Sequence, residues 1–147
     1  MIFVYTVNMK KLHPTLFVFA AAAALFFSAC ASQLNIPQDL SPSELIQRAQ
    51  EASDRNRYNQ ALQYYEALLE RNPTNIDLVC TAEYEIAFIH YKQKKFGLSR
   101  AGFNDLLARY NAPDGEYLPP QFKLLALKVL ERIDEKEKPR TFFSRGT

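Results

Sequence analysis

The sequence predicts an all-α protein in which five amphipathic helices follow a short apolar leader. Two observations predict this class. Between residues 42 and 137, apolar residues recur at intervals of three and four, which is the spacing of one face of an α-helix. No stretch of that region shows the sustained alternation of apolar and polar residues that a half-buried strand requires. The breaks between the periodic stretches are short, so neighbouring helices are expected to lie antiparallel.

The first helix is expected to begin at Pro42. Ser41 is a favoured N-cap residue, and a proline suits the first helical position because the N–H that it lacks would have no partner there. Glu44 follows Ser41 by three residues, which is the spacing of a capping box. The apolar face of this helix consists of Leu45, Ile46, Ala49 and Ala52. The residues Asp-Arg-Asn at 54–56 interrupt the pattern, so we expect a turn there.

Four further apolar stripes follow, at residues 58–69, 76–90, 96–107 and 122–133. Pro73 cannot continue a helix and moves the preceding residue away from helical angles, so the second helix is expected to end before it. The run NAPDG predicts a loop before the last helix. We expect residues 138–147 to form a loose tail.

The composition argues against nucleic-acid binding and catalysis. The formal charge of +2 comes from Lys10 and Lys11, because 16 basic and 16 acidic residues balance from residue 31 onward. That region has no GxSxG, HExxH or phosphate-binding glycine loop. The region has one histidine, His90, and one histidine cannot form a zinc site. His90 lies on an apolar stripe and Cys80 lies at the start of one, so both are expected to pack in the core. We expect no catalytic residue, no metal, no cofactor and no nucleic-acid partner.

Residues 9–30 read MKKLHPTLFVFAAAAALFFSAC, which is the order of a secretory signal peptide: lysines, an apolar core, and small residues before a cleavage site. The apolar core at 16–27 is shorter than the roughly 20 residues of a membrane-spanning helix. A tilted anchor or a buried helix is the alternative. Because a start at Met1 would place MIFVYTVN ahead of the lysines, we expect translation to begin at Met9.

The tetrad FSAC at residues 27–30 resembles the bacterial lipobox, usually Leu-Ala/Ser-Gly/Ala-Cys, with Phe27 replacing the leucine. The resemblance implies a lipoprotein signal peptide over residues 1–29 and lipidation at Cys30, whose acyl chains would hold the protein on a membrane. Residues 30–41 would then comprise the lipidated cysteine and a polar tether. Ala31 and Ser32 are not acidic, which in enteric lipoproteins favours the periplasmic face of the outer membrane over the inner membrane.

Residues 42–73 and 80–111 resemble two tetratricopeptide repeats (TPRs). A shift of 38 residues superimposes the small, aromatic and apolar positions of the family, which are Ala49 with Ala87, Tyr58 with Phe96, Ala61 with Ser99, Tyr65 with Phe103, and Leu68 with Leu106. The resemblance implies a TPR-like domain over residues 42–137, with about two antiparallel helix pairs and a C-terminal capping helix. The usual period is about 34 residues, so the link at 74–79 would be extended. A plain helical bundle is the alternative.

In this family the first helix of each pair lines a concave groove. The resemblance implies that a partner would contact Ile46, Gln50, Tyr84, Phe88, Tyr91 and Lys92, together with Ser53 and Thr81. Tyr84, Phe88 and Tyr91 lie on one helical stripe, and two interpretations are open: an aromatic platform for a peptide or helix, or packing against the fifth helix. Similarly, the basic cluster of Lys92, Lys94, Lys95 and Arg100 is either a solvated turn or a contact with lipid headgroups.

These observations predict a lipid-anchored protein of the bacterial cell envelope whose TPR-like domain acts as an adaptor or scaffold for another envelope protein or peptide. A carrier of a small apolar ligand is the alternative, which an enclosed pocket lined by Tyr84 and Phe88 would favour. A surface lipoprotein without a dedicated ligand is the third interpretation. Neither the partner nor the oligomeric state follows from the sequence.

Overall fold

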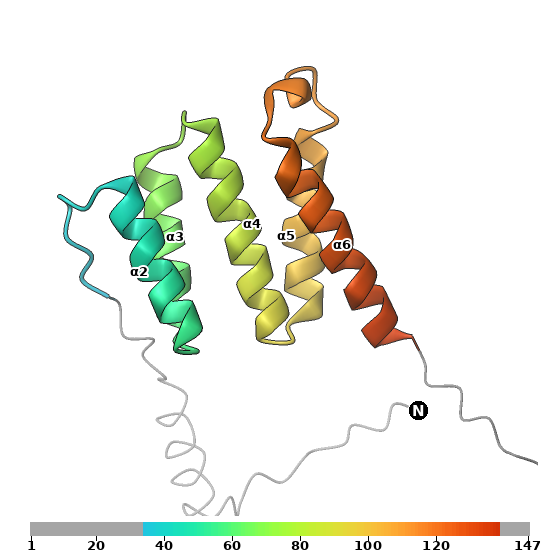
Figure 1. Ribbon diagram of the computed structural model, residues 1–147, viewed down its shortest axis with the longest axis horizontal. Coiled ribbons are helices and arrows are strands. Elements are labelled where there is room, and N and C mark those ends of the chain that lie inside the picture. Colours follow the sequence, from blue (N-terminus) through green and yellow to red (C-terminus); the bar gives the residue numbers. More distant parts are fainter. Residues whose placement is uncertain (1–33, 139–147) are drawn as a thin grey trace, which may run out of the picture. The chain divides into compact units, whose positions relative to one another are not determined.

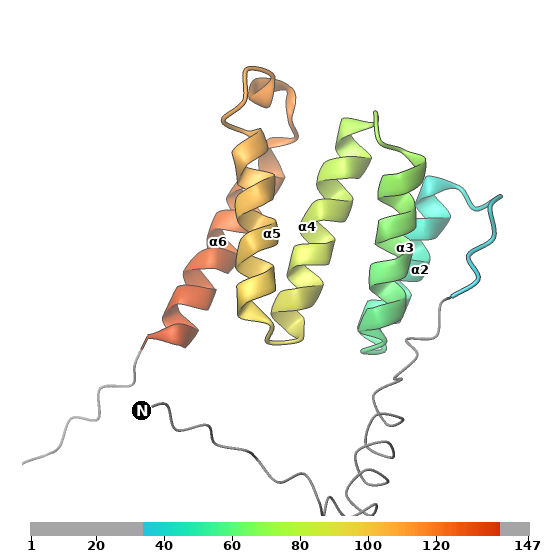
Figure 2. The same cartoon turned by 180° about the vertical axis from the view of Figure 1, so that it is seen from behind.

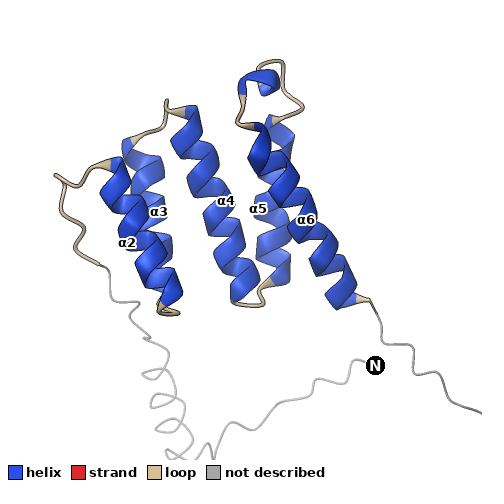
Figure 3. Cartoon of the chain, in the orientation of Figure 1, coloured by secondary structure: helices blue, strands red, loops and turns tan. Residues whose placement is uncertain are grey.

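The structure is a computed structural model that describes residues 34–138. These residues form five α-helices and one short 3-10 helix, and none of them forms a strand (Figure 3). The α-helices are α2 (Pro42–Asp54), α3 (Tyr58–Arg71), α4 (Ile76–Lys92), α5 (Phe96–Arg109) and α6 (Pro120–Glu137) (Figure 1). The predicted fold class and the five helices are therefore confirmed for this range. The predicted signal peptide, the lipidation site Cys30 and the predicted tail beyond residue 138 lie outside the described residues.

The helices lie in two layers. Figures 1 and 2, seen from opposite sides, show α2, α4 and α6 on one face and α3 and α5 on the other. α2 packs along α3, α4 packs along α5, and α3 joins the two antiparallel pairs by packing against α4. α6 packs against α5 and α4, where the first helix of a third pair would lie. This arrangement is consistent with the predicted TPR-like fold and its capping helix.

Local signals set the helix ends. The Ser41 hydroxyl oxygen accepts a hydrogen bond from the Glu44 N–H at 3.3 Å, and the Ser41 N–H donates to the Glu44 carboxylate at 2.8 Å, which confirms the capping box. α3 ends at Arg71, two residues before Pro73, as predicted. The Asn75 side chain accepts from the Leu78 N–H at 3.2 Å and so caps α4.

The turns confirm the interval of 38 residues independently of the side chains. Asn56 and Lys94 are the two non-glycine residues of the described range with positive φ, at 56° and 60°. The N–H that follows each of them donates to a carbonyl five residues earlier, from Arg57 to Ala52 at 2.8 Å and from Lys95 to His90 at 2.9 Å. The same turn therefore reverses the chain in both pairs, which a plain bundle would not require.

Small side chains lie where the helices of a pair approach most closely. Ala49, Ala61, Ala87 and Ser99 are at most 1% exposed, as the TPR resemblance implied. A Cβ atom on Gly102 would lie 3.0 Å from the Cβ of Ala87, so α4 and α5 are already in close contact there. The larger side chains of Tyr65 and Phe103 are also buried, and they belong to the first and second hydrophobic clusters respectively.

α6 supplies one wall of the second cluster. Its residues Ala126, Val129 and Ile133 are buried with Tyr84 and Phe103. Without α6, the apolar side chains that the second pair directs outward would face water. This exposure would cost about 25 cal/mol of folding free energy per Å² of apolar surface. Leu125, which falls within the stripe predicted at residues 122–133, is instead 39% exposed.

Two segments that we expected to be irregular are packed. Ile36 and Leu40 contact the first cluster, the Leu34 N–H donates to the Gln63 side chain at 2.6 Å, and the Arg71 guanidinium donates to the Pro37 carbonyl at 3.0 Å. Residues 34–40 therefore lie along α3, whereas the sequence suggested a tether extending to residue 41. Two apolar residues are too few to show a period, yet they are enough to hold a short segment against a helix.

The predicted loop after α5 is also ordered by its own contacts. It contains the 3-10 helix η2 (Gly115–Tyr117), which the sequence did not reveal. The Tyr110 hydroxyl donates to the Pro119 carbonyl at 2.6 Å, and a Cβ atom on Gly115 would collide with the Tyr110 carbonyl. Glycine is thus required where the loop crosses the end of α5.

Candidate protein-interaction groove

An open pocket lies between the first helices of the two pairs. It encloses about 290 Å³ and is lined by Gln50, Ser53 and Asp54 of α2, Tyr65 of α3, and Glu85, Phe88 and Lys92 of α4. We call it the α2–α4 pocket. The repeat geometry explains this placement, because α2 and α4 lie in the same layer and are joined by α3 from behind.

Lys92 links the two sides of the α2–α4 pocket. Its ammonium group donates a hydrogen bond to the Ser53 hydroxyl oxygen at 3.0 Å and lies 5.5 Å from the centroid of the Phe88 ring. The attraction between the cation and the ring face adds to the hydrogen bond. Lys92 is therefore oriented by partners from α2 and from its own helix.

Within the described part of the chain, the acidic groups of the pocket have no such partners. No lysine or arginine nitrogen of residues 34–138 lies within 4.0 Å of the Glu85 or Asp54 carboxylate. Burial raises the pKa of Glu85, and the positive charge of Lys92 opposes that rise. Tyr65 is 1% exposed, and its hydroxyl has no hydrogen-bond partner among the described residues. Burial also raises the pKa of the Tyr65 hydroxyl, and the charges of Glu85 and Asp54 add to the effect.

The predicted groove residues divide into two groups. Gln50, Phe88 and Lys92 meet in the α2–α4 pocket, together with Ser53. Ile46 is half-buried against the first hydrophobic cluster. Tyr91 lies further along α4, beyond the pocket, and Thr81 donates to the Asp77 carbonyl at 2.7 Å.

Tyr84 packs into the core. It is 8% exposed, and its ring lies 5.5 Å from Phe103 and 5.6 Å from Phe122, measured between ring centroids. Phe88 stacks on it at 5.9 Å and Tyr91 stacks on Phe88 at 5.8 Å, both with rings inclined by only 14°. Of the two interpretations of the aromatic stripe, packing against the fifth helix therefore describes Tyr84, whereas Phe88 reaches the groove.

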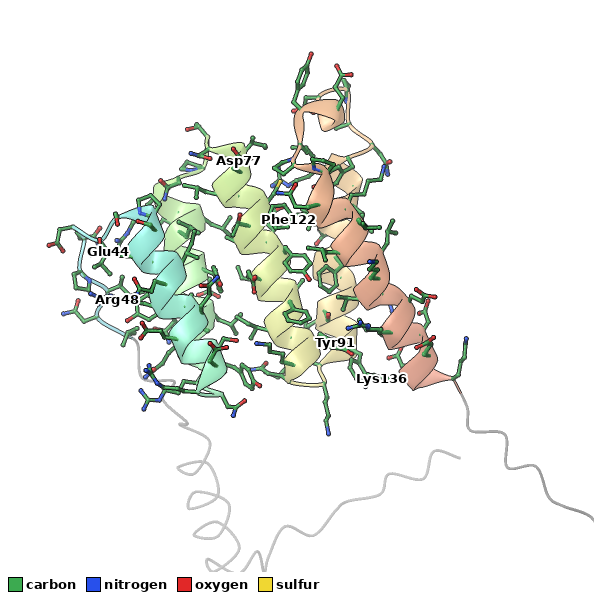
Figure 4. All side chains as sticks on the ribbon, in the orientation of Figure 1. Glu44, Arg48, Asp77, Tyr91, Phe122 and Lys136 are labelled. Atoms are coloured by element: carbon green, nitrogen blue, oxygen red, sulfur yellow. The ribbon has the colours of Figure 1, made fainter. Side chains whose placement is uncertain are left out.

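A second pocket lies at the far end of α4. It encloses about 370 Å³ and is lined by Tyr91, Lys92, Lys94, Phe96 and Lys136. Figure 4 shows Tyr91 and Lys136 side by side there, and Phe122 near the opposite end of α6; the Lys136 ammonium group is 5.9 Å from the Tyr91 ring centroid. Arg100, which we had grouped with these lysines, instead forms ion pairs with Asp134 at 2.7 Å and Glu137 at 2.6 Å, and so ties α5 to α6.

Cys80 and His90 lie on α4, and neither lines the α2–α4 pocket. Cys80 is fully buried and burial raises the pKa of its thiol, which disfavours the reactive thiolate. His90 is half-buried, and its Nδ1 atom has no hydrogen-bond partner among the described residues. Within residues 34–138 no three His, Cys, Asp or Glu side chains are close enough to hold a metal ion.

Comparisons with known proteins give two relatives. The chain is 34% identical over 118 residues to an uncharacterized protein of Treponema pallidum (strain Nichols), an alignment that covers 78% of this chain and 47% of that protein. It is 47% identical over 58 residues to a tetratricopeptide repeat and J domain-containing co-chaperone of Fusarium oxysporum f. sp. lycopersici, which covers 37% of this chain and 11% of the co-chaperone. No family model matches the chain, and no solved structure matches it. The chain thus spans about half the length of the first relative and a small part of the second.

Sequence reasoning missed three residues of the pocket. Glu85 lies three residues before Phe88 and seven before Lys92, so its helical face was readable from the sequence. Asp54 is the last residue of α2, where we had expected only a turn. Tyr65 was expected as an aromatic position of the first repeat, but its hydroxyl also borders the pocket.

Proposed function

We propose that this chain is an adaptor that binds another polypeptide in the groove between α2 and α4. The observation that carries the proposal is the α2–α4 pocket itself, which is open, has a mostly polar lining and lies in the layer formed by the first helices of the pairs. Similarity to a co-chaperone named for its tetratricopeptide repeats supports an interaction role. A polar, open groove suits a peptide or a helix better than it suits a small apolar molecule.

The carrier of an apolar ligand is the weaker candidate. It would need Tyr84 and Phe88 to enclose a cavity, whereas Tyr84 is occupied by contacts with Phe103 and Phe122. A lipoprotein without a dedicated ligand would leave the groove unused. Cross-linking within cells separates this third candidate from the adaptor.

We further propose that the adaptor is a cell-envelope lipoprotein anchored through Cys30, on the periplasmic face of the outer membrane. The lysines, the apolar run at 16–27 and the FSAC tetrad support this. In residues 34–138 no helix has the length and hydropathy that a membrane crossing needs. Only residues 31–33 separate Cys30 from Leu34, which binds Gln63.

The adaptor is tested by site-specific photo-cross-linking of the full chain in its own cells. A photoreactive phenylalanine analogue replaces Gln50 in the groove or, as the control, Glu66, which is exposed on α3 in the other layer. We expect a discrete cross-linked product from position 50 and not from position 66. Equal products from both positions, or none from position 50, would refute binding in the groove.

The anchor is tested by lipid labelling. Cys30→Ala should abolish incorporation of a labelled fatty acid and leave uncleaved precursor, whereas Cys80→Ala should retain both labelling and cleavage. The intact mass of the membrane-bound protein provides a second measurement. A labelled product from the Cys30→Ala variant would contradict lipidation at this residue.

A further inference from the structure

We propose that the α2–α4 pocket receives a basic side chain, lysine or arginine, of the partner polypeptide, and that the Glu85 and Asp54 carboxylates recognise it. This inference rests on the proposed adaptor function and deepens it, because it states which chemistry the groove selects. The juxtaposition that carries it is two carboxylates, one from each wall, beside a buried tyrosine hydroxyl, none of which has an ion-pair or hydrogen-bond partner among residues 34–138.

The two carboxylates form the acceptors of the site. Glu85 is half-buried on α4, and Asp54 is exposed at the end of α2. No cation of the described residues lies within 4.0 Å of either group. A partner that covers the groove would remove water from Glu85, and burying a carboxylate without a counter-charge is costly. A cation brought by the partner removes that cost, so the covered state selects basic residues.

Tyr65 points to the same conclusion independently. Its side chain is 1% exposed, it lines the pocket, and its hydroxyl has no hydrogen-bond partner in residues 34–138. Buried polar groups are nearly always hydrogen-bonded, so an unpaired hydroxyl at a pocket wall indicates that a ligand completes it. The hydroxyl oxygen can accept a hydrogen bond from an ammonium or guanidinium N–H and donate to a carboxylate.

The lysine of the pocket does not reverse this charge preference. Lys92 already donates to Ser53 at 3.0 Å and lies over the Phe88 ring. One ammonium group faces two carboxylates, so the lining has a net negative charge when all three are ionised. An acidic residue or a free C-terminal carboxylate entering the pocket would approach Asp54 and Glu85 and be repelled.

The size of the pocket limits the ligand to one side chain. A volume of about 290 Å³ accommodates a single long residue rather than a folded element. Flanking residues of the partner would then run over the groove surface near Gln50, which is exposed on α2. Arginine would form two parallel hydrogen bonds with one carboxylate, a geometry that lysine does not offer.

The test uses the full-length chain and three pools of short fluorescent peptides. The pools share randomised, uncharged flanks and differ at the central position, which is arginine, norleucine or glutamate. Fluorescence anisotropy gives the dissociation constant for each pool. We expect the arginine pool to bind about tenfold more tightly than the other two, which is the order of magnitude for a charge-assisted hydrogen bond. Equal affinities, or tighter binding of the glutamate pool, would overturn the inference.

The residues are tested by matched variants. Glu85→Gln should weaken binding of the arginine pool about tenfold and leave the norleucine pool unchanged, whereas Glu66→Gln, an exposed change on α3, should affect neither pool. Asp54→Asn removes the second carboxylate at an exposed position, where the substitution does not threaten folding. If the arginine pool binds Glu85→Gln and Asp54→Asn as tightly as it binds the unaltered chain, the proposal is contradicted.

One further variant separates failure of this inference from failure of the adaptor function. Gln50→Trp should fill the groove and so prevent the partner from binding. Because position 50 is then occupied, the photoreactive residue replaces Phe88 in this experiment, and we expect no cross-linked product from it. If Gln50→Trp abolishes cross-linking and Glu85→Gln does not change it, the adaptor holds and the basic-residue inference is wrong. If neither variant changes the product, the adaptor function itself fails.

Discussion

Tyr65 and Phe103 occupy equivalent repeat positions but differ by one hydroxyl group. Both rings are buried, in the first and second clusters, so the position itself accepts a phenylalanine. The extra hydroxyl of Tyr65 borders the α2–α4 pocket and has no hydrogen-bond partner within the described range 34–138. An unpaired buried hydroxyl destabilises the folded state of the free protein, which suggests that this residue serves binding more than folding.

Tyr65→Phe is therefore expected to stabilise the free chain. Removing the unpaired hydroxyl should raise the free energy of unfolding by about 1 kcal/mol, measured by urea denaturation. The control is Tyr58→Phe, because the Tyr58 hydroxyl donates to the Asn56 side chain at 2.7 Å and its loss should give no gain. A loss of stability in Tyr65→Phe would mean that the hydroxyl is satisfied, by an ordered water for example.

Glu85 should make stability fall as the pH rises. Its pKa is raised in the folded state by burial, so the folded chain binds a proton more readily than the unfolded chain does. Stability is therefore lost as the pH increases from the ordinary pKa of glutamate through the raised pKa of Glu85. Glu85→Gln removes this loss, and we expect the variant to be more stable than the unaltered chain at pH 7.

The measurement for Glu85→Gln is thermal or urea unfolding as a function of pH. The difference between the variant and the unaltered chain should grow with pH and level off above the raised pKa. Glu66→Gln, at an exposed position on α3, is the matched control. A difference between Glu85→Gln and the unaltered chain that does not change with pH would mean that Glu85 titrates normally.

At the scale of the elements, the two turns at 55–57 and 93–95 join the helices of each pair with the same hydrogen bonds. The residue with positive φ is Asn56 in the first turn and Lys94 in the second. Both residues have a Cβ atom that crowds the backbone there, but the short polar side chain of asparagine can hydrogen-bond locally and so tolerates this region better than lysine does. The second turn thus has a local strain that the packing of α4 on α5 overcomes.

Lys94→Gly should relieve that strain. Glycine adopts positive φ without a steric cost, so we expect the free energy of unfolding to rise by about 0.5–1 kcal/mol, measured by denaturant unfolding. Lys95→Gly is the matched control, because Lys95 has a φ of −83° and gains nothing from glycine. If both variants were equally destabilised, the positive φ of Lys94 would not be a source of strain in the folded chain.

At the scale of the whole molecule, α6 completes a stack that would otherwise end on an apolar face. Its buried residues meet Tyr84 and Phe103 from the second pair, and the Arg100 ion pairs with Asp134 and Glu137 lie at the border of that contact. These ion pairs are partly exposed and contribute little to the stability of the fold, so the apolar contact is what holds α6 on the second pair. The end helix therefore also determines which aromatic residues of α4 remain free for a partner.

Ile133→Ala tests the capping role. Ile133 is fully buried, and its truncation should cost about 2–5 kcal/mol and destabilise the second pair together with α6. Leu127→Ala on the exposed side of the same helix, at 48% exposure, should change stability by less than about 0.5 kcal/mol. Hydrogen exchange of α5 amides would show whether the two elements unfold together, and unchanged exchange there in Ile133→Ala would contradict the capping role.

The sequence by itself determined the five helices, the start of the first helix, the end of the second and the interval of 38 residues. These features depend on interactions within a few residues, such as the capping box at Ser41, the stop at Pro73 and the spacing of small and apolar side chains. Four of the predicted groove residues, Gln50, Ser53, Phe88 and Lys92, also meet in the pocket, because positions on one helical face follow from the period alone.

Only the tertiary structure decided what the pocket is made of. Tyr84 and Phe88 share a stripe in the sequence, yet α6 covers the first and leaves the second at the groove. Asp54 and Glu85 come from different helices, and the crossing of the pairs brings them to one pocket. The docking of residues 34–40 on α3 likewise depends on contacts with residues about 30 positions away. Such contacts are set by how helices pack in three dimensions, which no local pattern of residues encodes.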